Sequence, residues 1–316
     1  MMQPDPHLYH GLDIGGSKIE LVAFRATADQ LHEVHRERIP TPVQDFAHFV
    51  AAIGALVARG DKALGGQAVV GVGLPGIADA ATGRHLSSNV PALNGRVVAP
   101  ALESVLQRPV VIGNDCHCFA LSEALGGAAD KAPTMFGAIL GTGAGGGYCI
   151  GGRLQAGLNG IAGEWGHWSV PAHLLARYDL PVVDCPCGRR GCVERYVSGP
   201  GMSMLHSVLG GNGDEAATIA AAAATDQRAG ATVAAHLDLL AHALSNLVLS
   251  LDPHVIVLGG GLSRLPYLYR DLPCAVQRHL FAGTRVPPIL PPRFGDAGGA
   301  RGAALLARQH MKKTLS

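Results

Sequence analysis

Four side chains that bind metals well lie close together in the second half of the chain. His167 is followed by Cys185, Cys187 and Cys192, and these cysteines share the segment CPCGRRGC. Thiolate and imidazole donors suit tetrahedral zinc, and a site with four protein ligands leaves no open position for a substrate. We therefore expect a structural zinc ion here; free buried thiols are the alternative.

Three acids and an asparagine are candidates for proton transfer and hydroxyl binding. Asn114 and Asp115 stand where a strand is expected to end and a helix to begin. The helix amino terminus stabilises a charged carboxylate, so Asp115 could accept a hydroxyl proton; a plain helix cap is the alternative. Glu164 and Glu194 flank the zinc residues. They could bind vicinal hydroxyls, or be solvated surface acids.

Glycine accounts for 43 of the 316 residues, roughly twice its usual share of about 7%. The first glycine cluster, DIGGSK, predicts a turn in which Gly15 and Gly16 let backbone N–H groups approach an anion. Ser17 and Lys18 add a hydroxyl and a positive charge, and Asp13 could hold Mg²⁺ through water. An ordinary hairpin turn is the alternative.

Two further glycine clusters are GTGAGGG, over 141–147, and the end of VIVLGGGLS, over 255–263. GTGAGGG contains the G-x-G-x-x-G spacing of dinucleotide-binding sites, but that motif needs a helix directly after it. Tyr148-Cys149-Ile150 and a glycine turn follow instead, which favours a hairpin with a backbone nest for phosphate. Three clusters, each after a buried strand, point to a nucleotide.

Strands and helices have to position these candidates. Apolar runs and turn residues predict a strand, tight turn and returning strand over 10–24, and further strands over 68–74, 109–112, 136–140 and from 255. Helices are expected at about 45–59, 116–125, 214–251 and 299–309, and a loop-like segment at 164–199. This mixed order, repeated twice, predicts two α/β lobes around a cleft.

Composition restricts the class of protein. Hydrophobic residues make up 48% and charged residues 16%, which excludes a disordered chain. The net charge of +1, without blocks of like charge, gives no electrostatic hold on nucleic acid or an anionic membrane. An odd number of cysteines, 7, and no apolar signal segment or membrane-length run predict a cytoplasmic protein with reduced thiols.

Taken in order, these segments resemble the ROK family (repressors, open reading frames and kinases). The resemblance covers about residues 11–307, through DIGGSK, GLPG, SNVPALNG, NDCHCFALSEA, GTGAGGG, GEWGH, CPCGRRGCVE, VIVLGGG and GDAGGARGAA. It implies an α/β, two-lobed actin/hexokinase-like (ribonuclease H-like) fold with a central cleft and a zinc-bound loop. The expected lobes are residues 11–115, joined by the C-terminal helix at about 299–312, and residues 116–298.

The resemblance also implies roles for the candidates. Asp115 matches the family's catalytic base, which accepts the proton of a sugar C6 hydroxyl as it attacks the γ-phosphate of ATP. The implied sugar ligands are Asn114, Asp115, Glu164, His167 and Glu194, with Gly76 and Asn89 as further contributors. His167 would have its other ring nitrogen on zinc. The implied contacts to ATP and Mg²⁺ are Asp13, Gly15, Gly16, Ser17, Lys18, Gly141, Thr142, Gly143, Gly145, Gly146, Gly260 and Gly261.

The sugar itself is less determined. SNVPALNG, CFALSEA, YDLP and GDAGGARGAA are most similar to the bacterial N-acetyl-D-glucosamine kinases, whereas NGIAGEWGH equally resembles the fructokinase/mannokinase branch. The family's transcriptional repressors need an N-terminal helix-turn-helix, for which the roughly ten residues before DIGGSK are too few. A homodimer is expected from the relatives.

Overall fold

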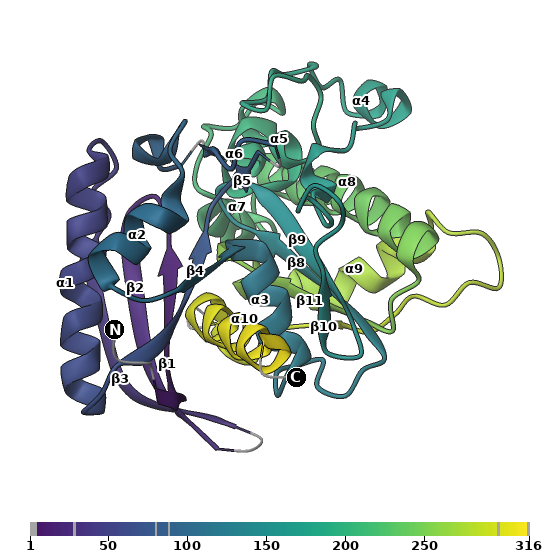
Figure 1. The fold of residues 1–316 in the computed structure, drawn as a ribbon. Coiled ribbons are helices and arrows are strands. Elements are labelled where there is room, and N and C mark those ends of the chain that lie inside the picture. Colours follow the sequence, from purple (N-terminus) through teal and green to yellow (C-terminus); the bar gives the residue numbers. More distant parts are fainter. Residues whose placement is uncertain (1–4, 28–29, 80, 88, 296–297, 315–316) are drawn as a thin grey trace.

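The computed structural model describes residues 5–27, 30–79, 81–87, 89–295 and 298–314. These residues form two five-stranded sheets with helices on their faces, side by side in Figure 1. This mixed α/β architecture of two sheets is the one predicted from the sequence. Ser88, Asp296 and Ala297, which belong to predicted motifs, lie outside the described residues.

The first sheet has the strand order β3-β2-β1-β4-β7. β1, β2 and β3 form an antiparallel meander, and β4 and β7 run parallel to β1. Its strands are β1 (Asp5–Ile14), β2 (Lys18–Ala26), β3 (Leu31–Pro40), β4 (Ala68–Leu74) and β7 (Val110–Asn114).

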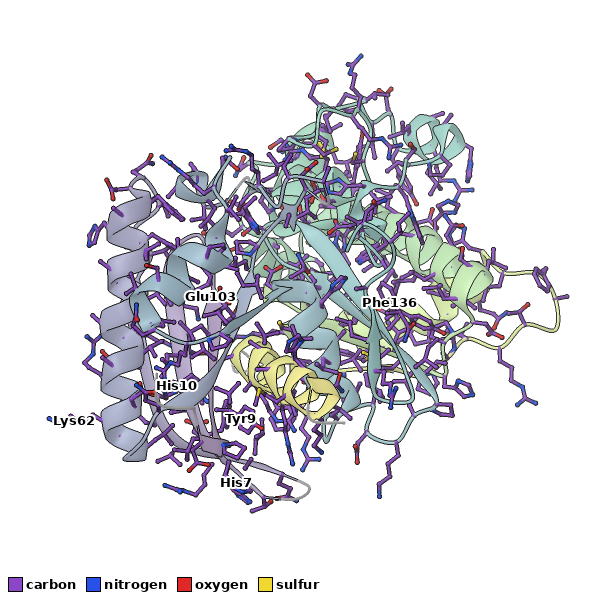
Figure 2. All side chains as sticks on the ribbon, in the orientation of Figure 1. His7, Tyr9, His10, Lys62, Glu103 and Phe136 are labelled. Carbon is purple, nitrogen blue, oxygen red and sulfur yellow. The ribbon has the colours of Figure 1, made fainter. Side chains whose placement is uncertain are left out.

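Side chains that alternate along these strands pack against different helices, because successive residues point to opposite faces of a sheet. Leu12 and Val70 share a core with α1 (Phe46–Leu64) and α2 (Val98–Leu106). Tyr9 and Val69 pack instead with the C-terminal helix α10 (Gly298–Thr314). Figure 2 shows Tyr9 beside this helix. Both faces of the first sheet are therefore covered.

The second sheet repeats the same connectivity, in the order β10-β9-β8-β11-β12. An antiparallel meander is again followed by two strands parallel to its first strand. Its strands are β8 (Thr134–Leu140), β9 (Ala144–Ile150), β10 (Arg153–Gln155), β11 (Val255–Gly259) and β12 (Ile289–Leu290). Helix α3 (Asp115–Ala124) packs on one face. The other face is covered by α5 (Glu194–Val197), α6 (Gly199–Val208), α7 (Ala216–Ala222), α8 (Gln227–Leu251) and α9 (Tyr267–Gln277).

The segment 164–199 contains more helix than the sequence predicted. It carries α4 (Ala172–Arg177), α5 and the short 3₁₀ helix η2 (Trp165–His167), so the expectation of a loop was partly wrong. These helices are at most six residues long, too short for a periodic pattern to stand out. The remaining short elements are β5 (Ile77–Ala78), β6 (His85–Leu86), η1 (Pro91–Leu93) and η3 (Gly261–Arg264).

Helix α8 is long and apolar enough to cross a membrane by length and composition. However, 67% of its most apolar window is buried inside the protein. A buried, apolar helix of this kind is typical of a protein core.

Helix α10 comes unusually close to its neighbours because glycines line the contacts. A Cβ atom on Gly11 of β1 or on Gly71 of β4 would overlap backbone carbonyls of α10, at Ala300 and Ala303. Gly302 of α10 in turn lies directly against the backbone carbonyl of Cys118 in α3. Helix α10 thus joins the first sheet to α3, which packs on the second. The division into lobes of 11–115 with 299–312, and 116–298, stays a prediction.

Replacing Gly302 by alanine should lower the free energy of unfolding by about 3 kcal/mol or more, since two helix backbones must move apart to admit one methyl group. Urea unfolding followed by circular dichroism measures this change. Gly261→Ala is the matched control, because no heavy atom lies within 4 Å of the Cβ it would add. Equal stabilities of the two variants would contradict the close contact of α3 and α10.

Candidate active site and metal centre

A cavity of about 450 Å³ lies between the two sheets. Its lining comes from both halves of the chain: Asp13, Lys18, Asp115, Phe119, Ile139, Gly260, Ser263, Arg264, Pro291, Pro292, Gly295 and Gly299. Residues predicted from separate motifs, namely the first hairpin, Asp115 and the third glycine cluster, therefore meet in one space.

The first glycine turn is a tight hairpin between β1 and β2. The Gly15 N–H donates to the Lys18 carbonyl at 2.9 Å, and the Thr41 hydroxyl donates to the Gly15 carbonyl at 2.7 Å. Gly16, Ser17 and Lys18 are exposed. Thr41 was not identified from the sequence, because an isolated threonine carries no signal of this contact.

Asp13 and Gly16 each lie close to a residue that is distant in the sequence. A Cβ atom on Gly299, in the first turn of α10, would overlap the Asp13 carboxylate. The positive end of the helix dipole stabilises a carboxylate in that position. A Cβ on Gly16 would lie 2.9 Å from the carbonyl oxygen of Asn89. The structure thus brings Asn89 to the hairpin, as an exposed residue.

The second glycine cluster divides into a turn and a strand. The Gly141 N–H donates to the Gly143 carbonyl at 2.9 Å, which closes a turn with Thr142 exposed at its tip. Gly145 and Gly146 lie inside β9 and are buried. Cβ atoms there would lie 2.8 Å from Cys116 Sγ and 2.5 Å from the Phe136 ring. These two glycines therefore permit close packing of β9.

The third cluster lies beside this turn. A Cβ on Gly260 would lie 3.1 Å from the backbone nitrogen of Gly141, whereas Gly261 has open space around it. Gly260 has φ = 76°, a conformation that strongly favours glycine. Ser263 and Arg264, on the following 3₁₀ helix, also line the cavity. Neither was identified from the sequence, since single serines and arginines after a glycine cluster carry no specific signal.

Asn114 and Asp115 begin α3 with different roles. The Asn114 side-chain oxygen accepts N–H groups of Cys116 and His117 at 2.9 and 3.2 Å, so Asn114 is the helix cap. Its amide group donates to the Gly76 carbonyl at 3.1 Å, which brings Gly76 to the site. Asp115 lies next to the cap and faces the cavity.

Burial raises the pKa of Asp115 to about 6, and the negative charge of Glu164 acts in the same direction. The Cys116 N–H, 2.9 Å from Asp115 Oδ1, opposes the rise. A carboxyl group with a pKa near neutrality is a stronger proton acceptor than an ordinary surface aspartate, while still being ionised above pH 6.

Glu164, whose charge acts on Asp115, lies near a histidine and a second acid. His167 Nε2 lies 3.6 Å from Glu164 Oε2, and His167 Nδ1 lies 3.8 Å from Glu194 Oε1. Burial raises the pKa of Glu164; His167 lowers it and Glu194 raises it. Glu194 also approaches the second hairpin, since a Cβ on Gly143 would lie 2.7 Å from its Oε2. Carboxylates that lie this close together can accept hydrogen bonds from several hydroxyl groups of one ligand.

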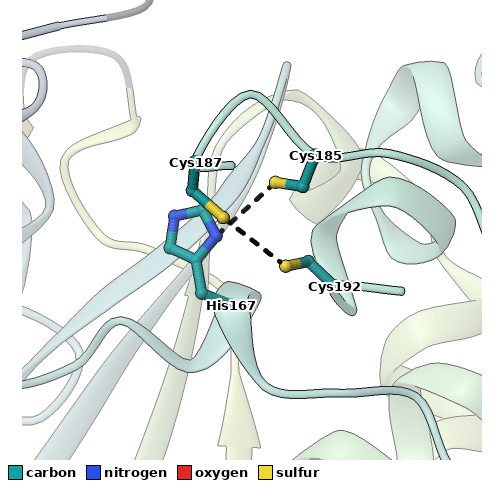
Figure 3. A group of neighbouring side chains, drawn as sticks. All are labelled: His167, Cys185, Cys187 and Cys192. Carbon is teal, nitrogen blue, oxygen red and sulfur yellow. Dashed lines mark hydrogen bonds between the residues drawn. The ribbon is translucent and has the colours of Figure 1, made fainter. Parts of the chain in front are cut away.

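The four predicted metal ligands converge (Figure 3). The ligand atoms of His167, Cys185, Cys187 and Cys192 all lie within 4.8 Å of one another. His167 Nδ1 lies 3.7 Å from Cys185 Sγ, and the sulfurs of Cys187 and Cys192 are also 3.7 Å apart. A tetrahedron with Zn–S bonds of about 2.3 Å has edges of about 3.8 Å. The donor set and its spacing therefore fit a tetrahedral metal ion.

One residue connects α3 to the segment before Glu164. His117 Nε2 lies 2.7 Å from the Ala162 carbonyl, and since a carbonyl only accepts, the ring donates. His117 lies two residues after Asp115 and Ala162 two residues before Glu164, so this bond links the segments that carry the two acids. The sequence had shown His117 as part of a motif, with no sign of its partner.

Known proteins resemble the chain over nearly its full length. The model of the ROK family matches residues 9–310. The N-acetylgalactosamine kinase AgaK of Shewanella sp. (strain ANA-3) is 45% identical, covering 95% of this chain and 96% of that protein. The N-acetyl-D-glucosamine kinase of Aliivibrio salmonicida is 41% identical, covering 95% and 99%.

Solved structures agree with this likeness. The ROK hexokinase from Thermus thermophilus superposes with a TM-score of 0.84 at 29% identity, covering 97% of this chain and 99% of that one. A ROK family glucokinase from Streptomyces griseus, in complex with glucose and AMPPNP, gives a TM-score of 0.77 at 28% identity, covering 96% and 99%. The predicted resemblance is confirmed, and the chain belongs to the ROK family.

Proposed function

We propose that this protein is an ATP-dependent sugar kinase that phosphorylates the C6 hydroxyl of N-acetyl-D-glucosamine, giving N-acetylglucosamine 6-phosphate and ADP. The observation that carries the proposal is the cavity that contains Asp115 together with Asp13 and Lys18. Phosphoryl transfer needs a proton acceptor for the attacking hydroxyl and positive groups for the phosphoryl oxygens. Residues of both kinds line the same space.

In this reaction Asp115 accepts the proton of the C6 hydroxyl as that oxygen attacks the γ-phosphate. Lys18 and the backbone N–H groups of the two turns, Gly15 to Ser17 and Gly141 to Gly143, stabilise the phosphoryl oxygens. Gly260 and Gly261 lie toward the nucleoside. Mg²⁺, when bound with ATP, neutralises phosphate charge, and Asp13 is the residue placed to hold it through water.

The sugar hydroxyls are held by the acids around Asp115. Glu164 and Glu194 accept hydroxyl protons, while the amide of Asn114 and the segments at Gly76 and Asn89 complete the pocket. Zinc bound by the Cys/His group would hold together the segments that carry His167 and Glu194. Because His167 turns Nδ1 toward the sulfurs, its Nε2 lies on the Glu164 side and can contact a hydroxyl.

A second candidate substrate is N-acetylgalactosamine. A relative at 45% identity bears the name of a kinase for that sugar, against 41% for the N-acetyl-D-glucosamine kinases. The two sugars share the acetamido group and differ at the C4 hydroxyl, so discrimination depends on few contacts. Fructose and mannose remain the alternatives suggested by NGIAGEWGH.

ADP release with Mg-ATP tests the proposal, using N-acetylglucosamine, N-acetylgalactosamine, N-acetylmannosamine, glucose, mannose and fructose in parallel. The highest kcat/KM is expected with N-acetylglucosamine. A preference for N-acetylgalactosamine, mannose or fructose would keep the mechanism and overturn the choice of sugar. A folded protein that releases no ADP with any of these sugars would contradict the kinase proposal and favour a sugar sensor.

The proposed setting is a homodimer in the cytoplasm, with sugar and ATP as partners and with neither nucleic acid nor membrane as a partner. The near-zero net charge of +1 supports the last two points. Light scattering after size-exclusion chromatography tests the dimer, for which a mass near twice 32.6 kDa is expected.

A further inference from the structure

The loop between His167 and Glu194, called the metal loop below, carries the metal ligands and sugar-binding candidates but little regular structure. One arm, before Cys185, contains α4 and Tyr178. The other, after Cys192, leads into α5, which begins at Glu194. A metal ion bound by these four ligands would hold the loop at one point only. Its orientation also depends on where the two arms are attached.

The first arm is attached to Asp238 of α8. The Arg177 guanidinium donates to Asp238 Oδ2 at 2.9 Å, and the Tyr178 hydroxyl donates to the same oxygen at 2.8 Å. His279, just after α9, donates from Nε2 to Asp238 Oδ1 at 2.8 Å. Asp238 is 6% exposed. A buried carboxylate with three donors, two of them from the α4 arm, is a strong attachment point.

The second arm is attached to His236, also on α8. His236 is fully buried, and its Nε2 lies 2.9 Å from the carbonyl of Val197, the last residue of α5. The carbonyl can only accept, so Nε2 carries the proton and Nδ1 accepts from the Tyr267 hydroxyl at 3.0 Å. This bond holds the far end of the helix that starts with Glu194.

His236 and Asp238 reach different arms because of helix geometry. Residues two apart point about 200° apart around a helix, so they cannot share a partner on one face. Helix α8 therefore passes between the two arms and contacts each with a polar side chain. Either contact alone would be an ordinary hydrogen bond of a buried polar side chain. Together they attach the α4 arm and the end of α5 to a single helix.

We propose that Asp238, acting through Arg177 and Tyr178, is a positioning residue for the sugar site. It fixes the first arm of the metal loop, and hence His167 at its start, relative to the second arm that His236 holds. The part of this proposal that concerns sugar affinity rests on the proposed kinase function. Its claim about the geometry of the loop is independent of any reaction.

Two variants that each remove one hydrogen bond to Asp238 test this proposal. Tyr178→Phe and His279→Phe each delete one donor to the Asp238 carboxylate and keep an aromatic ring. Only Tyr178 belongs to the metal loop. Tyr178→Phe should raise the KM for sugar about tenfold, the value of one hydrogen bond to a charged group, with kcat and the KM for ATP within about twofold. His279→Phe should change the KM for sugar less than about twofold. Its midpoint of thermal unfolding should nevertheless fall by about as much as that of Tyr178→Phe.

Metal release gives a second readout that needs no catalysis. In Zn²⁺-loaded protein, Tyr178→Phe should speed zinc transfer to a chromogenic chelator several-fold over wild type, and His279→Phe should not. Equal effects of the two variants on sugar KM and zinc release, or none in either, would overturn the positioning role. If the wild-type protein phosphorylates no sugar, the kinase proposal fails while zinc release still decides this one.

Discussion

Asp115→Asn should lower kcat by about 10²- to 10⁴-fold, the usual contribution of a general base, and leave sugar binding nearly unchanged. Asparagine has the size of aspartate, and Asn114, the helix cap, is untouched. The amide cannot accept the C6 hydroxyl proton. Initial rates of ADP release and calorimetric titration with sugar measure the two quantities separately.

The pH dependence of the wild-type enzyme gives a related test. Since burial raises the pKa of Asp115 to about 6, its carboxyl group is protonated below that pH and cannot act as the proposed base. The value of kcat/KM should therefore rise with pH through about 6 and level off above it. Asp271→Asn, a change at a surface acid paired with Arg270, should reproduce the wild-type profile. Near-normal turnover of Asp115→Asn would refute the assignment of the base.

Cys187→Ala should abolish stoichiometric metal binding and, with it, lower sugar affinity by about 10- to 100-fold. Cys187 is the exposed member of the group, so its loss removes a ligand without opening a buried cavity. Without the metal, His167 and the cysteines near Glu194 lose the bonds that join them directly to one another. ATP affinity should change little, because both glycine turns lie outside this loop.

Elemental analysis and sugar titration measure these effects together. The control is Cys274→Ala, which removes another exposed cysteine, one outside the metal group. It should keep one metal ion per chain and normal sugar affinity. A native protein purified without zinc, or a Cys187→Ala protein that binds sugar normally, would contradict the structural role of the metal.

The sequence predicted the elements whose signal is local. The strand over 68–74 was found with its observed bounds because all of its residues are buried and apolar. β3 was missed because it is the polar edge strand of its sheet, and its charged residues read as loop. Helix α2 was missed for another reason: it is short and contains a proline.

The residues of the candidate site also divide into those with a local sequence signal and those without one. The metal ligands were found because Cys185, Cys187 and Cys192 are close in sequence as well as in space. Gly145 and Gly146 show what the sequence could not predict. A glycine can form an anion-binding turn or permit close packing, and the two uses look alike in a sequence. Only the close neighbours of these two glycines in β9 show that they permit packing. The meeting of Asp115 with Lys18, and the attachment of α4 to α8, depend on tertiary contacts that no local pattern records.

The position of α10 has a consequence for how the protein is made. Residues 298–314 are synthesised long after β7, yet they cover the face of the first sheet that contains Tyr9 and Val69. At roughly 5–20 residues per second, that sheet waits about 10–40 s after β7 is synthesised. During this interval the apolar face of the first sheet that α10 covers is exposed to solvent. A chain that lacks α10 would therefore be a substrate for chaperones and proteases rather than a slightly weakened enzyme.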